Sequence, residues 1–143
     1  MLPARISLVT LGTRDLTRMR AFYRSLGWEE HHPEAEGFAT FKTGGGVLAL
    51  FPLEQLAEDA NQPLPPERQG FRGVTLAVNV EAPEMVDAAV EAARAAGAEI
   101  VREPSDAFWG GRTAYFADPE GNLWEIAHAP NAAFDERCGL IWS

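Results

Sequence analysis

An internal repeat limits the folds open to this chain more than any other feature of its sequence. Val9-Thr10-Leu11 recurs as Val74-Thr75-Leu76, an offset of 65 residues. Each copy is followed by a stretch with apolar residues at helical spacing that ends at a glycine, and each copy closes on a strand led by a glycine. Duplication within one small chain usually builds a scaffold with a pseudo-twofold axis and a cavity on that axis.

The first copy predicts the order strand, helix, strand, strand, strand. Asp15 is placed to cap the helix, and Gly27 suits the residue that follows its end. The predicted elements are a strand over 6–12, a helix over 16–26 and strands over 28–32, 38–42 and 47–51.

The second copy repeats this order. Pro83 suits the first position of a helix, Gly97 its end, and Asp118-Pro-Glu-Gly121 is a turn signal between two strands. The predicted elements are a strand over 74–80, a helix over 83–96 and strands over 99–102, 113–117 and 123–128.

The segment between the copies, residues 52–72, is rich in proline and reads as a connector with a short helix over 53–60. A module of about 50 residues buries too little surface to be stable alone. We therefore expect one domain over 1–143, with modules at 6–51 and 73–129 and an irregular tail at 130–143. The tail carries apolar residues that must pack on this chain or on a partner: Phe134, Leu140, Ile141 and Trp142.

Charge and cysteine content exclude several classes of function. The 12 basic and 21 acidic residues give a net charge of -9, which argues against a nucleic-acid partner and suits either a solvated acidic surface or a cationic ligand. The single cysteine, Cys138, rules out an internal disulfide and fits a reducing cytoplasm. No apolar stretch approaches the ~18 residues that span a bilayer, so we expect no membrane partner.

Two runs resemble one known family. They are Asp15-Leu16, Phe22-Tyr23 and Leu26-Gly27 in the first half, and Phe116-Ala-Asp-Pro-Glu-Gly-Asn-Leu-Trp-Glu125 in the second. Over residues 6–130 the chain resembles the vicinal oxygen chelate superfamily, which includes glyoxalase I, extradiol dioxygenases, fosfomycin-resistance enzymes and bleomycin-resistance proteins. The resemblance implies an α+β fold of two tandem βαβββ modules, whose mixed sheets curl around a cavity, and commonly a homodimer.

The resemblance also implies where a metal would bind. In metal-using members, one pair of ligands begins the first strand of each module, and the other pair lies on the last strand of each. These positions map to Leu8 and Gly73, and to Leu50 and Glu125, the second pair being aligned through the leading glycines of the two last strands. Only Glu125 offers a ligand atom, so we expect no resident metal or other cofactor. A divalent metal on other residues stays an alternative.

The same geometry predicts a mostly apolar pocket with few polar groups, which is typical of small-molecule sites. Tyr115 rather than Phe116 is expected to form an aromatic wall, and Trp109 either a lid or a packed loop. A buried Glu125 needs a partner, for which Arg112 is the first candidate and Arg102 or Arg72 the substitutes. The predicted ligand-binding residues are Thr10, Leu50, Thr75, Trp109, Arg112, Tyr115 and Glu125.

Three functions follow. The first is metal-free binding of a small organic molecule, as in the bleomycin-resistance branch, which sequesters a cationic, aromatic drug. The second is a metal-dependent lyase, isomerase or dioxygenase. The third is a cofactor-free enzyme in which Glu125 is the catalytic general base. We expect binding to be the function, in a cytoplasmic homodimer.

Overall fold

The computed structural model describes residues 1–67 and 70–142. Contacts divide the chain into two compact units, Met1–Gln69 with Glu136–Gly139, and Gly70–Asp135 with Leu140–Ser143. The first unit contains the 6–51 module and most of the connector, and the second contains the 73–129 module and most of the tail. Among the described residues, no helix combines the length and apolar character needed to cross a bilayer.

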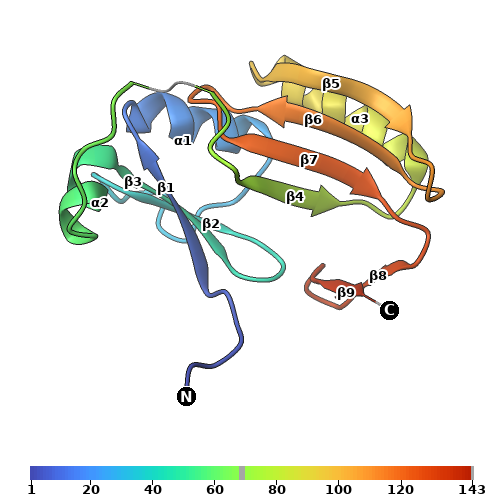
Figure 1. Cartoon of the computed structure of the whole chain (residues 1–143), viewed down its shortest axis with the longest axis horizontal. Coiled ribbons are helices and arrows are strands. Elements are labelled where there is room, and N and C mark those ends of the chain that lie inside the picture. Colours follow the sequence, from blue (N-terminus) through green and yellow to red (C-terminus); the bar gives the residue numbers. More distant parts are fainter. Residues whose placement is uncertain (68–69, 143) are drawn as a thin grey trace. The chain divides into compact units, whose positions relative to one another are not determined.

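The first unit is a three-stranded sheet with two helices. Strands β1 (Leu8–Thr13) and β3 (Val47–Pro52) are parallel, and β2 (Ala39–Lys42) pairs antiparallel with β3, so the order is β1-β3-β2. Helix α1 (Leu16–Ser25) follows β1, and α2 (Leu53–Asp59) follows β3 (Figure 1). The short helix predicted in the connector is thus confirmed.

Helix α1 forms as its sequence predicts. The Asp15 side chain accepts a hydrogen bond from the Arg18 amide, which confirms the cap. The buried residues of α1 are Met19, Phe22 and Tyr23, and the Tyr23 ring lies 5.8 Å from that of Phe41 on β2. These contacts define the face of the first sheet that packs on α1.

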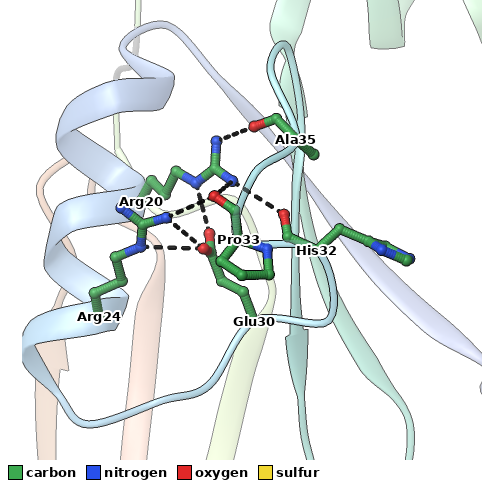
Figure 2. A network of polar contacts seen from close by, with 6 residues as sticks. All are labelled: Arg20, Arg24, Glu30, His32, Pro33 and Ala35. Atoms are coloured by element: carbon green, nitrogen blue, oxygen red, sulfur yellow. Dashed lines mark hydrogen bonds and ion pairs between the residues drawn. The ribbon is translucent and has the colours of Figure 1, made fainter.

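The predicted strand over 28–32 is reduced to a single bridge between Glu30 and Phe41. A polar network with arginines of α1 holds Glu30 and the residues that follow the bridge, as Figure 2 shows. Arg20 Nε and Arg24 Nη2 contact the buried carboxylate of Glu30 at 2.6 and 2.5 Å. The two guanidinium groups also bind the carbonyls of His32, Pro33 and Ala35. Within 28–32 the Glu29 carbonyl and the His31 amide still pair with Lys42 and Thr40 of β2. The carbonyls that the arginines bind begin at His32, so the pairing stops there and the chain turns away from β2.

The second unit has the predicted βαβββ order. Its elements are β4 (Thr75–Asn79), α3 (Pro83–Ala95), β5 (Glu99–Asp106), β6 (Arg112–Ala117) and β7 (Leu123–His128). The sheet has the order β4-β7-β6-β5, with β4 and β7 parallel and the other pairs antiparallel. Helix α3 covers one face of this sheet (Figure 1).

The core of the second unit lies between α3 and that face. Val86 and Val90 of α3 are buried, as are Phe116 on β6 and Trp124 on β7, whose rings stack 6.3 Å apart. Because side chains alternate along a strand, the neighbours of Phe116 and Trp124 point to the opposite face. That opposite face carries Tyr115 and Glu125.

The tail is not irregular, as we expected, but forms a hairpin of β8 (Ala132–Phe134) and β9 (Leu140–Trp142). Its apolar side chains pair across the strands, with Phe134 opposite Leu140 and Ala132 opposite Trp142. Cross-strand apolar pairs of this kind stabilise a hairpin. The connecting residues, 136–139, belong to the first unit.

The α+β class is confirmed. Both main sheets are mixed, and neither closes, because each strand order begins and ends at a free edge strand.

Candidate functional site

The strand registers show which residue of the first unit corresponds to Glu125. Gly12 on β1 pairs with Phe51 on β3, and Ala77, 65 residues after Gly12, pairs with Glu125 on β7. Phe51 is therefore the counterpart of Glu125, and the assignment of Leu50 to that position was wrong.

Leu50 instead pairs with Leu11 and is fully buried. It lies on the same face as Leu48 and Phe41, which packs against Tyr23 of α1. Alignment through the leading glycines misplaced the register by one residue, and a step of one residue reverses the face of a strand.

A metal held at the family's four positions does not fit these residues. The positions hold Leu8, Gly73, Phe51 and Glu125, and only the glutamate has a ligand atom. Glu125 Oε2 already accepts a hydrogen bond from the Tyr115 hydroxyl. Within residues 1–67 and 70–142, no group of three or more His, Cys, Asp or Glu side chains could hold a metal ion.

Tyr115 and Glu125 form a pair on the face of the second sheet that points away from α3. They are opposite each other in the register of β6 and β7, and the hydroxyl lies 2.9 Å from Glu125 Oε2. Both side chains are partly exposed. Burial raises the pKa of Tyr115, the hydrogen bond to Glu125 raises it further, and the charge of Arg102 opposes the rise.

Arg102 of β5 completes this arrangement. Its Cζ atom lies 5.8 Å from the centre of the Tyr115 ring, within the range of a cation–π contact. Its Nη2 donates to Ser105 Oγ at 3.2 Å and to Thr113 Oγ1 at 3.1 Å. We call Arg102, Thr113, Tyr115 and Glu125 the Tyr115 cluster.

Arg112, our first candidate as a partner of Glu125, pairs elsewhere. Its Nε and Nη2 contact the two carboxylate oxygens of Asp87 on α3 at 2.7 and 2.8 Å, and Nη1 contacts Asp106 at 3.0 Å. The Arg112 hydrogen bond is the main cause of the lowered pKa of Asp87. The expected Arg112–Glu125 pair is wrong because Arg112 is opposite His128, which places it on the α3 face.

The other predicted site residues lie apart from the cluster or at its margin. Thr10 on β1 and Thr75 on β4 are exposed, and Thr75 shares the face of the Tyr115 cluster. Trp109, in the β5–β6 connection, packs on Gly111, where an added Cβ would be 1.9 Å from its ring. The side chain is nevertheless 47% exposed, so the lid and the packed loop both stay predictions.

Two threonines were missed in the sequence. Thr113 is buried and positions Arg102, and the only available signal was its alternation with Ala114 along β6. The hydroxyl oxygen of Thr40 is buried without a hydrogen-bond partner among the described residues. Thr40 pairs with Ala49, which pairs with Thr10, so the three share the face of the first sheet opposite α1.

Solved structures share this fold. A glyoxalase-related enzyme from Fulvimarina pelagi is 29% identical, with a TM-score of 0.88 and 99% of each chain covered. A lactoylglutathione lyase from Agrobacterium tumefaciens is 26% identical, with a TM-score of 0.67, 89% of this chain and 95% of that chain covered.

A curated relative, the anthracycline biosynthesis protein DnrV from Streptomyces peucetius, is 30% identical over 120 residues, which are 81% of this chain and 44% of the relative. This chain thus spans less than half the length of the curated relatives that it matches. The model of the Glyoxalase/Bleomycin resistance protein/Dioxygenase superfamily matches residues 5–126. The chain belongs to that superfamily, also known as the vicinal oxygen chelate superfamily.

Proposed function

We propose that this chain binds a small organic molecule on the face of its second sheet that carries the Tyr115 cluster, without a metal at the family's ligand positions. The observation that carries the proposal is the 2.9 Å hydrogen bond between Tyr115 and Glu125 on a face that α3 leaves uncovered. A partly exposed carboxylate fixed by a hydroxyl is an orienting group for a ligand.

The rest of that face supports the proposal. Around the cluster the strands present small or apolar side chains, Ala77 on β4 and Leu123 and Ala127 on β7, with Thr75 at the margin. Apolar walls with few convergent polar groups are the usual composition of a small-molecule site.

The relatives support the same class of ligand. The names of the similar proteins refer to a lactoylglutathione lyase and to anthracycline biosynthesis, both of which concern small organic molecules. The three family ligand positions without a donor atom separate this chain from members that depend on a metal.

The binding test compares wild type with Glu125→Gln, Tyr115→Phe and the control Glu91→Gln. Glu91 is an exposed residue of α3. Thermal shift and titration calorimetry would use an anthracycline, a hydroxyanthraquinone, lactoylglutathione and a cationic aromatic drug. We expect one class to bind and Glu125→Gln to weaken it by about 10- to 100-fold, because a charged hydrogen bond contributes about 1.5–3 kcal/mol. Glu91→Gln should bind like wild type.

Two results would contradict the proposal: no stabilisation by any compound, or equal affinities in wild type and Glu125→Gln. Metal content of the purified chain is measured in parallel. A stoichiometric divalent metal that is lost in Glu125→Gln would favour the metal-dependent alternative instead.

The second candidate is a cofactor-free enzyme that uses Glu125 as a general base. Its support is that Glu125 Oε1 has no hydrogen-bond partner among the described residues, while Oε2 is held by Tyr115. An oriented carboxylate with one unoccupied oxygen can accept a proton from a ligand. Any compound that binds is incubated with wild type and Glu125→Gln, and its conversion is followed by mass spectrometry. Conversion by wild type alone is the expected result, and equal conversion by both would contradict this role.

We also propose a cytoplasmic homodimer. The support for a dimer is the apolar strand β9, where Leu140, Ile141 and Trp142 are 46%, 49% and 64% exposed. Sedimentation of the chain and of a truncation after Pro130 tests it. We expect a dimer that the truncation weakens, and a monomeric chain would contradict the proposal.

A further inference from the structure

The backbone of β5 is built so that Arg102 points to the ligand-binding face. Ile100 pairs with Phe116, which faces α3, and regular alternation would place Arg102 on that same face. A register shift between Ile100 and Arg102 brings Arg102 opposite Tyr115 instead, and a second shift follows before Ser105. Such bulges re-aim a side chain and occur often next to functional sites.

Arg102 is exposed, and the groups that contact its guanidinium are neutral. Its partners are the hydroxyls of Ser105 and Thr113 and the ring of Tyr115, and Thr113 is only 4% exposed. No carboxylate is paired with Arg102 in the part of the chain that the structure describes. The guanidinium is thus oriented in advance and retains its capacity to bind an anion.

Four other arginines show the contrast. Arg20, Arg24, Arg94 and Arg112 each contact at least one carboxylate, whereas Arg72, like Arg102, donates to a neutral group, the amide oxygen of Asn122. In a chain with 21 acidic residues, an oriented arginine without such a partner is a site for an acidic group from elsewhere.

Tyr115 contacts both the guanidinium of Arg102 and the carboxylate of Glu125. Its ring face contacts Arg102, and its hydroxyl binds Glu125. The positive group therefore lies over the ring face of this side chain, and the negative group lies at its hydroxyl end. A ligand that satisfies both needs an acidic oxygen at one end and a hydrogen-bond donor at the other.

We infer that Arg102 binds an acidic oxygen of the ligand, a carboxylate or an ionised phenol or enol, while Glu125 accepts a hydrogen bond from a hydroxyl of the same molecule. The ligand class is a small hydroxy acid or a compound with the same pair of groups. This inference rests on the proposed function and specifies the ligand for the same site.

The test uses a matched pair of probes, 6-hydroxy-2-naphthoate and its methyl ester, which carry their two polar groups at opposite ends and differ in the negative charge. Titration calorimetry compares wild type with Arg102→Gln, Arg102→Lys and the control Arg94→Gln, an arginine of α3 paired with Glu103. We expect wild type and Arg94→Gln to prefer the acid by about 10-fold or more. Arg102→Gln should reduce that preference to about 2-fold or less, because it lowers the affinity for the acid and leaves the affinity for the ester unchanged. Arg102→Lys should keep part of the preference.

The outcomes separate this inference from the proposed function. Equal binding of acid and ester by wild type, or an unchanged preference in a folded Arg102→Gln, would overturn the role of Arg102. If neither probe binds, the hydroxy-acid class is wrong. In each case the proposed function still stands if another compound binds in a manner that depends on Glu125. Thermal unfolding of each variant confirms that it is folded.

Discussion

Tyr115 is the residue on which the site depends, because one side chain contacts both a carboxylate and a guanidinium. Its hydroxyl can donate to Glu125 only while it is protonated, and its ring lies under the guanidinium of Arg102. The alternation of residues 115 and 116 was enough to predict that Tyr115 and Phe116 occupy opposite faces. The sequence named Arg102 only as a substitute for Arg112, because Arg102 reaches this face through a bulge in β5 that alternation does not reveal.

The raised pKa of Tyr115 makes a testable prediction about alkaline pH. Since the folded pKa lies above the unfolded value of about 10, the folded state binds the proton more tightly. This contribution to stability is complete below pH 10 and is lost as the pH rises through the folded pKa. Ultraviolet titration should show a late transition that disappears in Tyr115→Phe.

Substituting the neighbours of Tyr115 separates the causes of its shift. Glu125→Gln should move the late transition to lower pH, because it removes the anion that accepts the hydrogen bond. Arg102→Gln should move it to higher pH, because it removes the nearby positive charge. A transition that is unaffected by both substitutions would contradict the geometry of the Tyr115 cluster.

At the scale of elements, local signals predicted the helices and the second module correctly. Asp15 caps α1, Pro83 begins α3, and Gly27 and Gly97 follow the helix ends with φ of 86° and 99°. The segment over 28–32 has strand-like residues and keeps two backbone hydrogen bonds to β2, but the pairing stops at His32. From there Arg20 and Arg24 on α1 bind the backbone carbonyls, and local propensity could not reveal these contacts between a helix and the loop that follows it.

The attachment of the tail depends on the turn before β3. An added Cβ on Gly44 would lie 2.6 Å from the carbonyl oxygen of Cys138 and 2.8 Å from that of Arg137. Both contacts are with backbone, which cannot move aside without displacing residues 136–139. We expect Gly44→Ala to lower the free energy of unfolding by about 1–3 kcal/mol. Amide exchange should become faster in 136–139.

Gly45→Ala is the matched control. An added Cβ on Gly45 meets nothing within 4 Å, and this glycine does not have a positive φ. Its stability and amide exchange should match wild type or improve slightly. Equal behaviour of the two variants would show that the tail does not depend on the close approach at Gly44.

At the scale of the whole molecule, the excess of acidic residues makes stability sensitive to acid. Burial opposes the ionisation of Glu30, but hydrogen bonds from Arg20 and Arg24 outweigh it, so its pKa is lowered. A carboxylate with a lowered folded pKa stabilises the protein above its unfolded pKa. That contribution is lost as the pH falls through the folded pKa. We therefore expect the free energy of unfolding to decline below about pH 4.5.

Neighbouring glutamates supply the test of this prediction. Glu30→Gln should lower the free energy of unfolding by about 3 kcal/mol at neutral pH, because two arginines lose their buried anion. It should also make the free energy of unfolding fall less steeply as the pH decreases. Glu29→Gln removes only an exposed contact with Lys42 and should have little effect. Denaturant unfolding between about pH 6 and pH 3 measures both. If the free energy of unfolding of Glu30→Gln fell with decreasing pH as steeply as that of wild type, Glu30 would not be the source of the acid sensitivity.

The sequence by itself determined the superfamily, the α+β class and the order of elements in the second module. The reason is that hydrophobic periodicity, helix caps and turns are signals carried by neighbouring residues. In addition, the internal repeat allows the elements of one copy to be checked against those of the other. Only the tertiary structure decided that Phe51 rather than Leu50 is the counterpart of Glu125, that Arg112 binds Asp87, and that Arg102 joins Tyr115. These pairings depend on strand register and on bulges, where a shift of one residue moves a side chain to the opposite face of the sheet.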